Sequence, residues 1–316
     1  MASGWRALRR RIITPDVSET SLEVRGFYVK NDAAKELLET VGRSFLTGYA
    51  IAAEARTPLD AATPLEGVPR QFRGFAYEGA TMAFAMLDGL PFGAPRRAET
   101  FLAGPADPHI YMGYVGVGWA MARLPRFRWH TLHARDPLLR WLILDGYGFH
   151  QAYFHTDRYV HGQFDEARQA GYAKRVIDQG IGRAMWFVGG TDPDLVATMI
   201  DKFPEQRRAD MYSGAGLAAT YAGGADEWEL RHLWQRAGEY RASVAQGCVF
   251  GASARVRAGL VTPHTELAAR TFCGLTAADA SAIADQARVD LTGSDQQPSY
   301  EVWRQRIANQ FVSLER

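Results

Sequence analysis

The chain has 316 residues, of which 47% are hydrophobic and 22% are charged. This length and composition provide enough apolar surface for one large buried core or two ordinary domains. The 36 basic and 35 acidic residues leave a formal charge of +1, so no overall field attracts the protein to nucleic acid or to a membrane.

Local features indicate a protein of the cytoplasm. No apolar run reaches the roughly 18 residues that a transmembrane helix needs, so we expect no membrane insertion. The first thirty residues lack the hydrophobic centre of a signal peptide. Two cysteines, Cys248 and Cys273, lie among small apolar residues and are expected to be buried free thiols in a reducing compartment.

Residues 1–31 are predicted to form an extension that precedes the main domain. A basic run, Arg6, Arg9, Arg10 and Arg11, could contact an anionic partner but is typical of a solvated terminal helix. The segment from Ser21 to Lys30 alternates weakly between apolar and polar residues, which predicts a short extended piece.

From Asp32 onward the sequence predicts pairs of helices in one all-α domain, residues 32–316. Four helix starts show a capping residue before proline, at Asp107, Asp136, Asp192 and Thr262. Glycine pairs, Gly189-Gly190 and Gly223-Gly224, are expected to end two successive units 34 residues apart. A polar break over residues 291–299 then precedes a last helix, Tyr300 to Leu314, which we expect to cap the stack.

A glycine followed four residues later by a small residue returns with a period near 34. The first glycines of the seven copies are Gly48, Gly79, Gly116, Gly146, Gly180, Gly214 and Gly247. Glycine inside a helix costs about 1 kcal/mol relative to alanine, and close approach of a neighbouring helix is the usual compensation. We therefore predict an α/α helical-repeat solenoid of about seven helix-pair units, each of roughly 34 residues, whose units could close around a central cavity.

The residue before each repeat glycine is polar in six of the seven copies. These residues are Thr47, Glu78, Val115, Asp145, Gln179, Ser213 and Gln246, and one helical turn later come Ile51, Met82, Trp119, Phe149, Arg183, Leu217 and Phe250. Such a face would line the concave surface of a solenoid. The substrate-binding candidates are Gln179, Arg183, Ser213, Gln246, Trp119 and Phe149. The alternative, that these polar residues bond to neighbouring helices or face bulk water, stays open.

Glu78, Asp145 and His150 are the candidate catalytic residues. A carboxylate inside an apolar groove is destabilised by desolvation, which could prepare Glu78 or Asp145 for proton transfer with His150 as partner. A structural role for His150 remains an alternative. His150 stands four residues after a repeat glycine, where the other six copies have alanine or glycine. Arg183 could hold a carboxylate or phosphate of a ligand, or pair with Asp145 or Glu78. Histidine spacings after His150 do not fit a metal pair, so we expect neither metal nor cofactor.

Several stretches carry a resemblance to a known family. They are Gly26–Asp32, Arg73–Ala80, Gly116–Ala120, Leu144–His150 and Gly180–Ala184. The chain resembles the UnbL-type accessory proteins, a family without assigned chemistry whose genes accompany enediyne polyketide synthases. The resemblance covers nearly the whole chain and implies a part in turning a linear polyene into an enediyne core.

Three functions are therefore considered. The first is an accessory protein of enediyne or polyketide biosynthesis that binds or transforms a hydrophobic polyene in an apolar groove, with other enzymes of the pathway as further partners. The second is a non-catalytic scaffold that binds a partner enzyme. The third, an isoprenoid cyclase, is weakened because the chain has no aspartate-rich diphosphate motif.

Overall fold

The computed structural model describes residues 2–90, 96–165, 171–294 and 297–312. Its regular elements over these ranges are all helical, which confirms the all-α prediction. Seven helices carry the repeat glycines: α3 (Asp32–Glu54), α5 (Arg73–Asp88), α7 (Ile110–Arg123), α8 (Leu142–Phe154), α9 (Tyr172–Val188), α11 (Glu205–Tyr221) and α13 (Arg241–Arg257). The other helices are α1 (Ala2–Ile13), α2 (Leu22–Arg25), α4 (Ala62–Glu66), α6 (Arg97–Leu102), α10 (Pro193–Asp201), α12 (Glu227–Ala237), α14 (Pro263–Cys273), α15 (Ala277–Ala287) and α16 (Ser299–Asn309).

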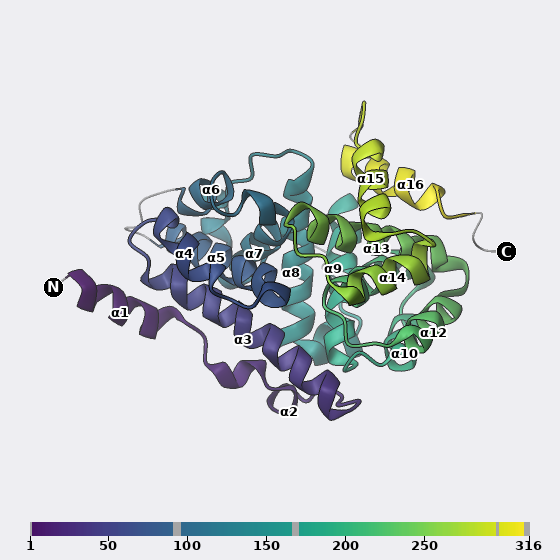
Figure 1. Ribbon diagram of the computed structural model, residues 1–316, viewed down its shortest axis with the longest axis horizontal. Coiled ribbons are helices and arrows are strands. Elements are labelled where there is room, and N and C mark those ends of the chain that lie inside the picture. Colours follow the sequence, from purple (N-terminus) through teal and green to yellow (C-terminus); the bar gives the residue numbers. More distant parts are fainter. Residues whose placement is uncertain (1, 91–95, 166–170, 295–296, 313–316) are drawn as a thin grey trace.

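The seven glycine-bearing helices pack in chain order, each against the next, from α3 to α13 (Figure 1). From α9 onward each is followed by a shorter helix, and these shorter helices, α10, α12 and α14, pack against one another in turn. Earlier connections are less regular. Between α7 and α8 the described chain forms only short 3-10 turns, and between α8 and α9 only a single π-turn, Asp157–His161. Among the described residues the expected helix pairs are therefore regular from α9 to α14, whereas α4 and α6, the helices between α3, α5 and α7, are short.

Close approach between neighbouring helices explains the glycines. A Cβ at Gly180 would lie 2.0 Å from the carbonyl oxygen of Asp145 on α8, and one at Gly148 would lie 2.3 Å from that of Ile177 on α9. Residues two apart on a helix point roughly 200° apart, so the first glycine of each Gly-x-Gly faces the preceding helix and the second faces the following one. Carbonyl oxygens lie equally close to Gly48, Gly79, Gly116, Gly118, Gly146, Gly182, Gly214, Gly216 and Gly247.

Residues 34 positions apart on neighbouring helices contact one another. Asp145 on α8 accepts a hydrogen bond from Gln179 on α9, with 2.7 Å between Oδ2 and Nε2. One turn later, the ring of Phe149 lies beside the guanidinium of Arg183, 5.1 Å from ring centroid to Cζ. Thr47 is the exception, because it is exposed and donates to a carbonyl of its own helix. The first copy therefore does not follow the pattern.

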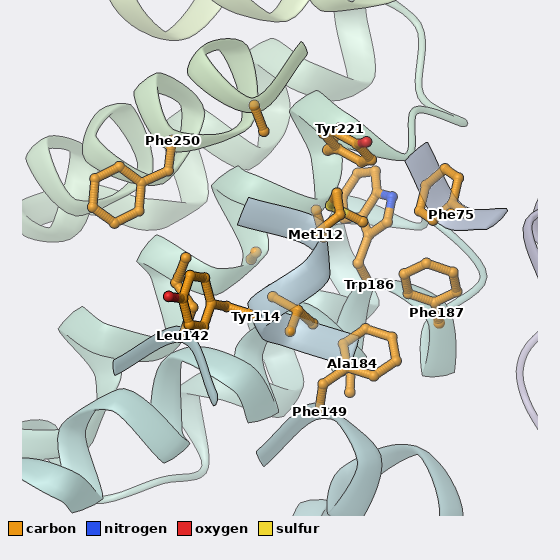
Figure 2. Packing of buried hydrophobic residues seen from close by; sticks show 14 of the residues in the cluster. Phe75, Met112, Tyr114, Leu142, Phe149, Ala184, Trp186, Phe187, Tyr221 and Phe250 are labelled. Carbon is orange, nitrogen blue, oxygen red and sulfur yellow. The ribbon is translucent and has the colours of Figure 1, made fainter. Parts of the chain in front are cut away.

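The last glycine-bearing helices lie back against the first ones. Arg255 of α13 donates to the carbonyl oxygen of Gln71, just before α5, at 2.8 Å. The rings of Tyr221 on α11 and Phe75 on α5 meet with centroids 5.1 Å apart. Large buried side chains, most of them aromatic, pack between these helices (Figure 2).

The sequence predicted some helix starts correctly but misassigned one segment near the N-terminus. Asp192 and Thr262 cap α10 and α14 as predicted, each accepting from the backbone N–H three residues on. The segment predicted to be extended instead contains α2, capped by the Ser21 hydroxyl. A short capped turn has no hydrophobic period, so alternation was the wrong signal there. The last helix, predicted over Tyr300 to Leu314, ends at Asn309, and the last two residues of that prediction lie outside the described ranges.

Both cysteines are free and buried, as predicted. Within the described part of the chain, every helix is too short or too polar to cross a bilayer.

Candidate functional site

An apolar cavity opens between α3, α5, α7, α8, α9 and α11. The space between its walls is about 830 Å³ when the solvent at its mouth is included. Aromatic and aliphatic side chains form most of its wall, and Figure 2 shows several of them: Phe75, Phe149, Phe187 and Tyr221. We call this space the first cavity.

A second cavity of about 390 Å³ adjoins it between α7, α8, α9, α11, α13 and α16. The two cavities share three wall residues, Arg183, Leu217 and Tyr221. Glu78 lines the first cavity and Asp145 lines the second. Arg183 borders both cavities, so its side chain lies between the two carboxyl groups.

Glu78 is the buried acid of the first cavity. Its side chain is 3% exposed and forms no ion pair among the described residues. Burial raises the pKa of the Glu78 carboxyl to about 8, against the opposing pull of the Arg183 cation. Glu78 therefore carries a proton at neutral pH and can donate it to a molecule in the cavity.

Arg183 and Asp145 form a fully buried ion pair between α9 and α8. The second carboxylate oxygen of Asp145 accepts from the Gln179 amide, which also approaches the Tyr300 hydroxyl at 3.4 Å. This resolves one alternative left open by the sequence, since Arg183 does pair with Asp145. Because both oxygens of Asp145 are occupied, it is less suited to proton donation than Glu78.

His150 lies behind the wall of the first cavity, not beside the two carboxyls. Its ring contacts those of Phe154 and Trp119, with centroids 4.6 and 5.5 Å apart. Neither ring nitrogen has a partner among the described residues. Burial lowers the pKa of His150 to about 3, so the imidazole stays neutral at physiological pH. The predicted pairing of His150 with Glu78 or Asp145 is not present, because the residue's helix face turns it toward Trp119.

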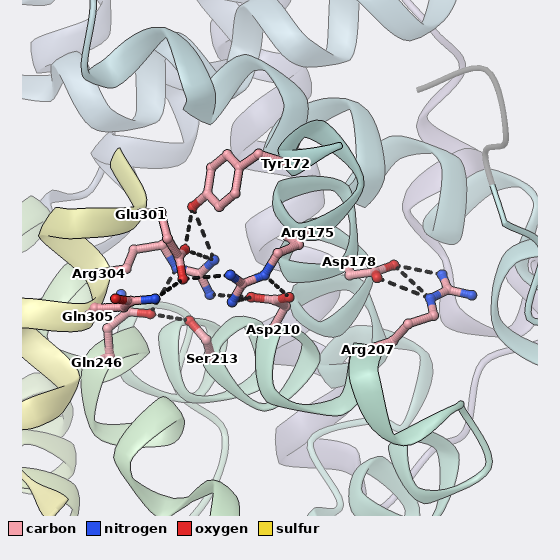
Figure 3. A network of polar contacts seen from close by, with 10 residues as sticks. All are labelled: Tyr172, Arg175, Asp178, Arg207, Asp210, Ser213, Gln246, Glu301, Arg304 and Gln305. Atoms are coloured by element: carbon pink, nitrogen blue, oxygen red, sulfur yellow. Dashed lines mark hydrogen bonds and ion pairs between the residues drawn. The ribbon is translucent and has the colours of Figure 1, made fainter. Parts of the chain in front are cut away.

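Ser213 and Gln246 belong to a separate polar network (Figure 3). The Ser213 hydroxyl donates to Gln246 Oε1 at 2.7 Å, and Arg304 of α16 approaches the same oxygen at 3.3 Å. Arg304 also pairs with the buried Asp210 at 2.8 Å, while Glu301 of α16 pairs with Arg175 at 2.6 Å. Helix α16 is thereby fastened across α9, α11 and α13.

The predicted binding residues therefore separate into two groups. Trp119, Phe149 and Arg183 line the first cavity. Gln179, Ser213 and Gln246 are buried and line neither cavity; their side chains bond to neighbouring helices, as the alternative interpretation stated.

Sequence reasoning missed part of the cavity wall. Tyr153, Phe187 and Tyr221 all line the first cavity and are spaced 34 residues apart, two turns after the polar positions. Extending the period by one more turn would have found them. The sequence contains no such signal for Arg304 or Glu301, because their partners Asp210 and Arg175 lie far away in sequence and outside the 34-residue period.

Across the residues with described positions, no group of three or more His, Cys, Asp or Glu side chains is placed to hold a metal ion. His155, Asp157 and His161 are exposed, whereas His150 is buried.

The fold and the cavity define an all-α protein with a buried acid facing an apolar chamber. By sequence, the chain belongs to the family described as "Protein of unknown function (DUF1702)", which matches residues 4–311. No curated protein and no solved structure matches it.

The raised pKa of Glu78 predicts a pH-dependent stability. Between its ordinary value of 4.5 and its folded value of about 8, the folded state keeps a proton that the unfolded chain has lost. Relative to Glu78→Gln, the wild type should lose about 1.4 kcal/mol of unfolding free energy per pH unit across this window, and no more above it. Denaturant titrations of both proteins from pH 5 to pH 9 measure the difference. A difference that does not change with pH would show that Glu78 is already ionised.

Proposed function

We propose that the first cavity holds an elongated, mostly apolar small molecule and that Glu78 faces it as a protonated acid. One observation carries this proposal: a chamber lined by aromatic rings contains a buried carboxyl with no cationic partner of its own. Arg183, the cation that acts on the Glu78 carboxyl, is already paired with Asp145. Such a wall favours apolar contact with a ligand, and the acid adds one directed polar interaction.

We further propose that the glycine-bearing helices are the units of a helical-repeat solenoid that curves around this cavity. The contacts between equivalent positions, such as Asp145 with Gln179 and Ser213 with Gln246, support this interpretation. Apolar groups one turn beyond the polar positions then become the wall of the cavity.

The resemblance to UnbL-type proteins supports a linear polyene as the ligand and enediyne or polyketide biosynthesis as the setting. A polyene is long, thin and apolar, which suits a chamber bounded by six helices. As an enzyme, the protein would use Glu78 to protonate the bound molecule, and the ionised Asp145–Arg183 pair would contribute a fixed field next to it.

An acid-initiated cyclisation of an isoprenoid is a second candidate. This reaction requires a protonated carboxyl that faces a space lined by aromatic rings. Glu78 supplies the carboxyl, and Phe75 and Phe149 are among the rings of the wall. The scaffold function gains no support from Asp145 and Gln179, because both are buried and unavailable to a partner enzyme.

The test is the intact mass of the protein after co-expression with a polyene-forming synthase, measured by native mass spectrometry. We expect the wild type to carry one polyene per chain. Ala222→Trp, which places an indole at the partly exposed end of the cavity, should lose this adduct while keeping its helical circular dichroism. Ala278→Trp, at an exposed position on α15, is the matched control and should keep it.

A further inference from the structure

The first helix, α1, presents an apolar stripe to solvent. Trp5, Leu8 and Ile12 lie at i, i+3 and i+7, so they share one helix face, and they are 65, 46 and 68% exposed. Val17, just after the helix, is 61% exposed. A contiguous exposed apolar strip of this kind is typical of a surface that binds a membrane or another molecule.

The same helix is basic and carries no acidic residue. Its charged side chains are Arg6, Arg9, Arg10 and Arg11. An amphipathic helix whose stripe of tryptophan, leucine and isoleucine is flanked by arginines is suited to the interface of an anionic bilayer.

Helix α1 is fastened to the body of the protein through Arg9 and Arg10. Arg9 donates to the carbonyl oxygens of Ala53 and Ala55 at the end of α3, at 2.6 and 2.8 Å. Arg10 pairs with Glu54 at 2.9 Å. Figure 1 shows α1 lying along the edge of the molecule below α4 and beside α3. The apolar stripe is therefore held facing outward.

The first cavity opens close to the end of this helix. Pro15 and Glu19, which follow α1 directly, line the cavity and are partly exposed, as is Leu46 on α3. A surface that covered the apolar stripe would therefore lie next to the mouth of the cavity.

We propose that α1 docks the protein on an anionic phospholipid surface. Trp5, Leu8 and Ile12 enter the interface between headgroups and acyl chains. Arg6 and Arg11, the two arginines of α1 that are not used to fasten it to α3, pair with lipid phosphates. A second copy of the chain is a poorer occupant, because pairing two α1 helices would bring their arginines together. The docking does not depend on the proposed ligand, so either idea can fail alone.

Flotation of the purified full chain with vesicles tests the proposal. We expect binding to vesicles of phosphatidylglycerol and phosphatidylcholine in equal parts, little binding to pure phosphatidylcholine, and weaker binding as salt rises. The triple variant Trp5→Ser, Leu8→Ser, Ile12→Ser should reduce the partition coefficient about tenfold or more. Arg6→Gln with Arg11→Gln should reduce it several-fold and flatten its dependence on salt.

Trp228→Ser with Val289→Ser is the matched control, since both residues are exposed, 69 and 60%, and lie away from α1. It should bind as the wild type does. Failure of the wild type to bind anionic vesicles, or an equal loss in this control, overturns the proposal. So does a wild-type dimer that the triple variant converts to a monomer without any vesicle binding, because the stripe is then an interface between copies.

Discussion

Replacing Arg183 by methionine is expected to destabilise the protein by about 3–5 kcal/mol, the range measured when one partner of a buried ion pair is removed. The side chain of Asp145 has no solvent exposure, so its carboxylate would lose its cation with no access to water. Guanidinium denaturation measures the loss directly. Arg231→Met, which removes an exposed pair with Glu227 on the surface of α12, should change stability by about 0.5 kcal/mol or less.

A second substitution separates charge from packing. In Arg183→Met with Asp145→Asn the unpaired carboxylate is gone, while an amide can still bond to Gln179. We expect the double variant to recover about 2 kcal/mol or more relative to Arg183→Met alone. A double variant as unstable as the single one would mean that Arg183 stabilises the fold through its contacts with Phe149 and not through its charge.

Gly180→Ala is expected to destabilise the protein by about 3 kcal/mol, although alanine is the better helix former by about 1 kcal/mol. The added methyl would lie 2.0 Å from the Asp145 carbonyl oxygen and 2.8 Å from the Phe149 amide nitrogen. Both are backbone atoms of α8, so the two helices must move apart and the Arg183–Asp145 pair must stretch with them.

Gly4→Ala is the matched substitution. Gly4 also lies in a helix, but nothing approaches its would-be Cβ within 4 Å, so we expect unchanged or slightly higher stability. Thermal unfolding compares the two variants. If Gly180→Ala melted at or above the wild-type temperature, helix approach would not be the reason for the glycines.

Much of the architecture could be predicted because it depends on local and periodic signals. Asp192 and Thr262 cap helices through residues three positions away, and the repeat glycines report contact between neighbouring helices. The period also singled out Glu78 and Asp145, and both are buried. These features follow from spacing alone, without knowledge of which helices meet.

The remaining features depend on partners that are distant in sequence. The period could not tell that Gln246 bonds to Ser213 and Arg304 instead of facing a cavity, because α16 folds over that part of the inner face. The environment of His150 also depends on a residue of another helix. His150 stands four residues after a repeat glycine, where the other copies have a small residue, and its ring packs against Trp119 of α7. The irregular connections around α8 were also hidden, since the glycine spacing stays near 34 despite them.

The account depends most directly on whether the first cavity is filled in the cell. Native mass spectrometry of wild type and Ala222→Trp, each purified from cells whose extracts contain the polyene, gives the answer in one comparison. We predict one added polyene mass per wild-type chain and bare Ala222→Trp. A bare wild type, or equal loading of both proteins, would contradict the account.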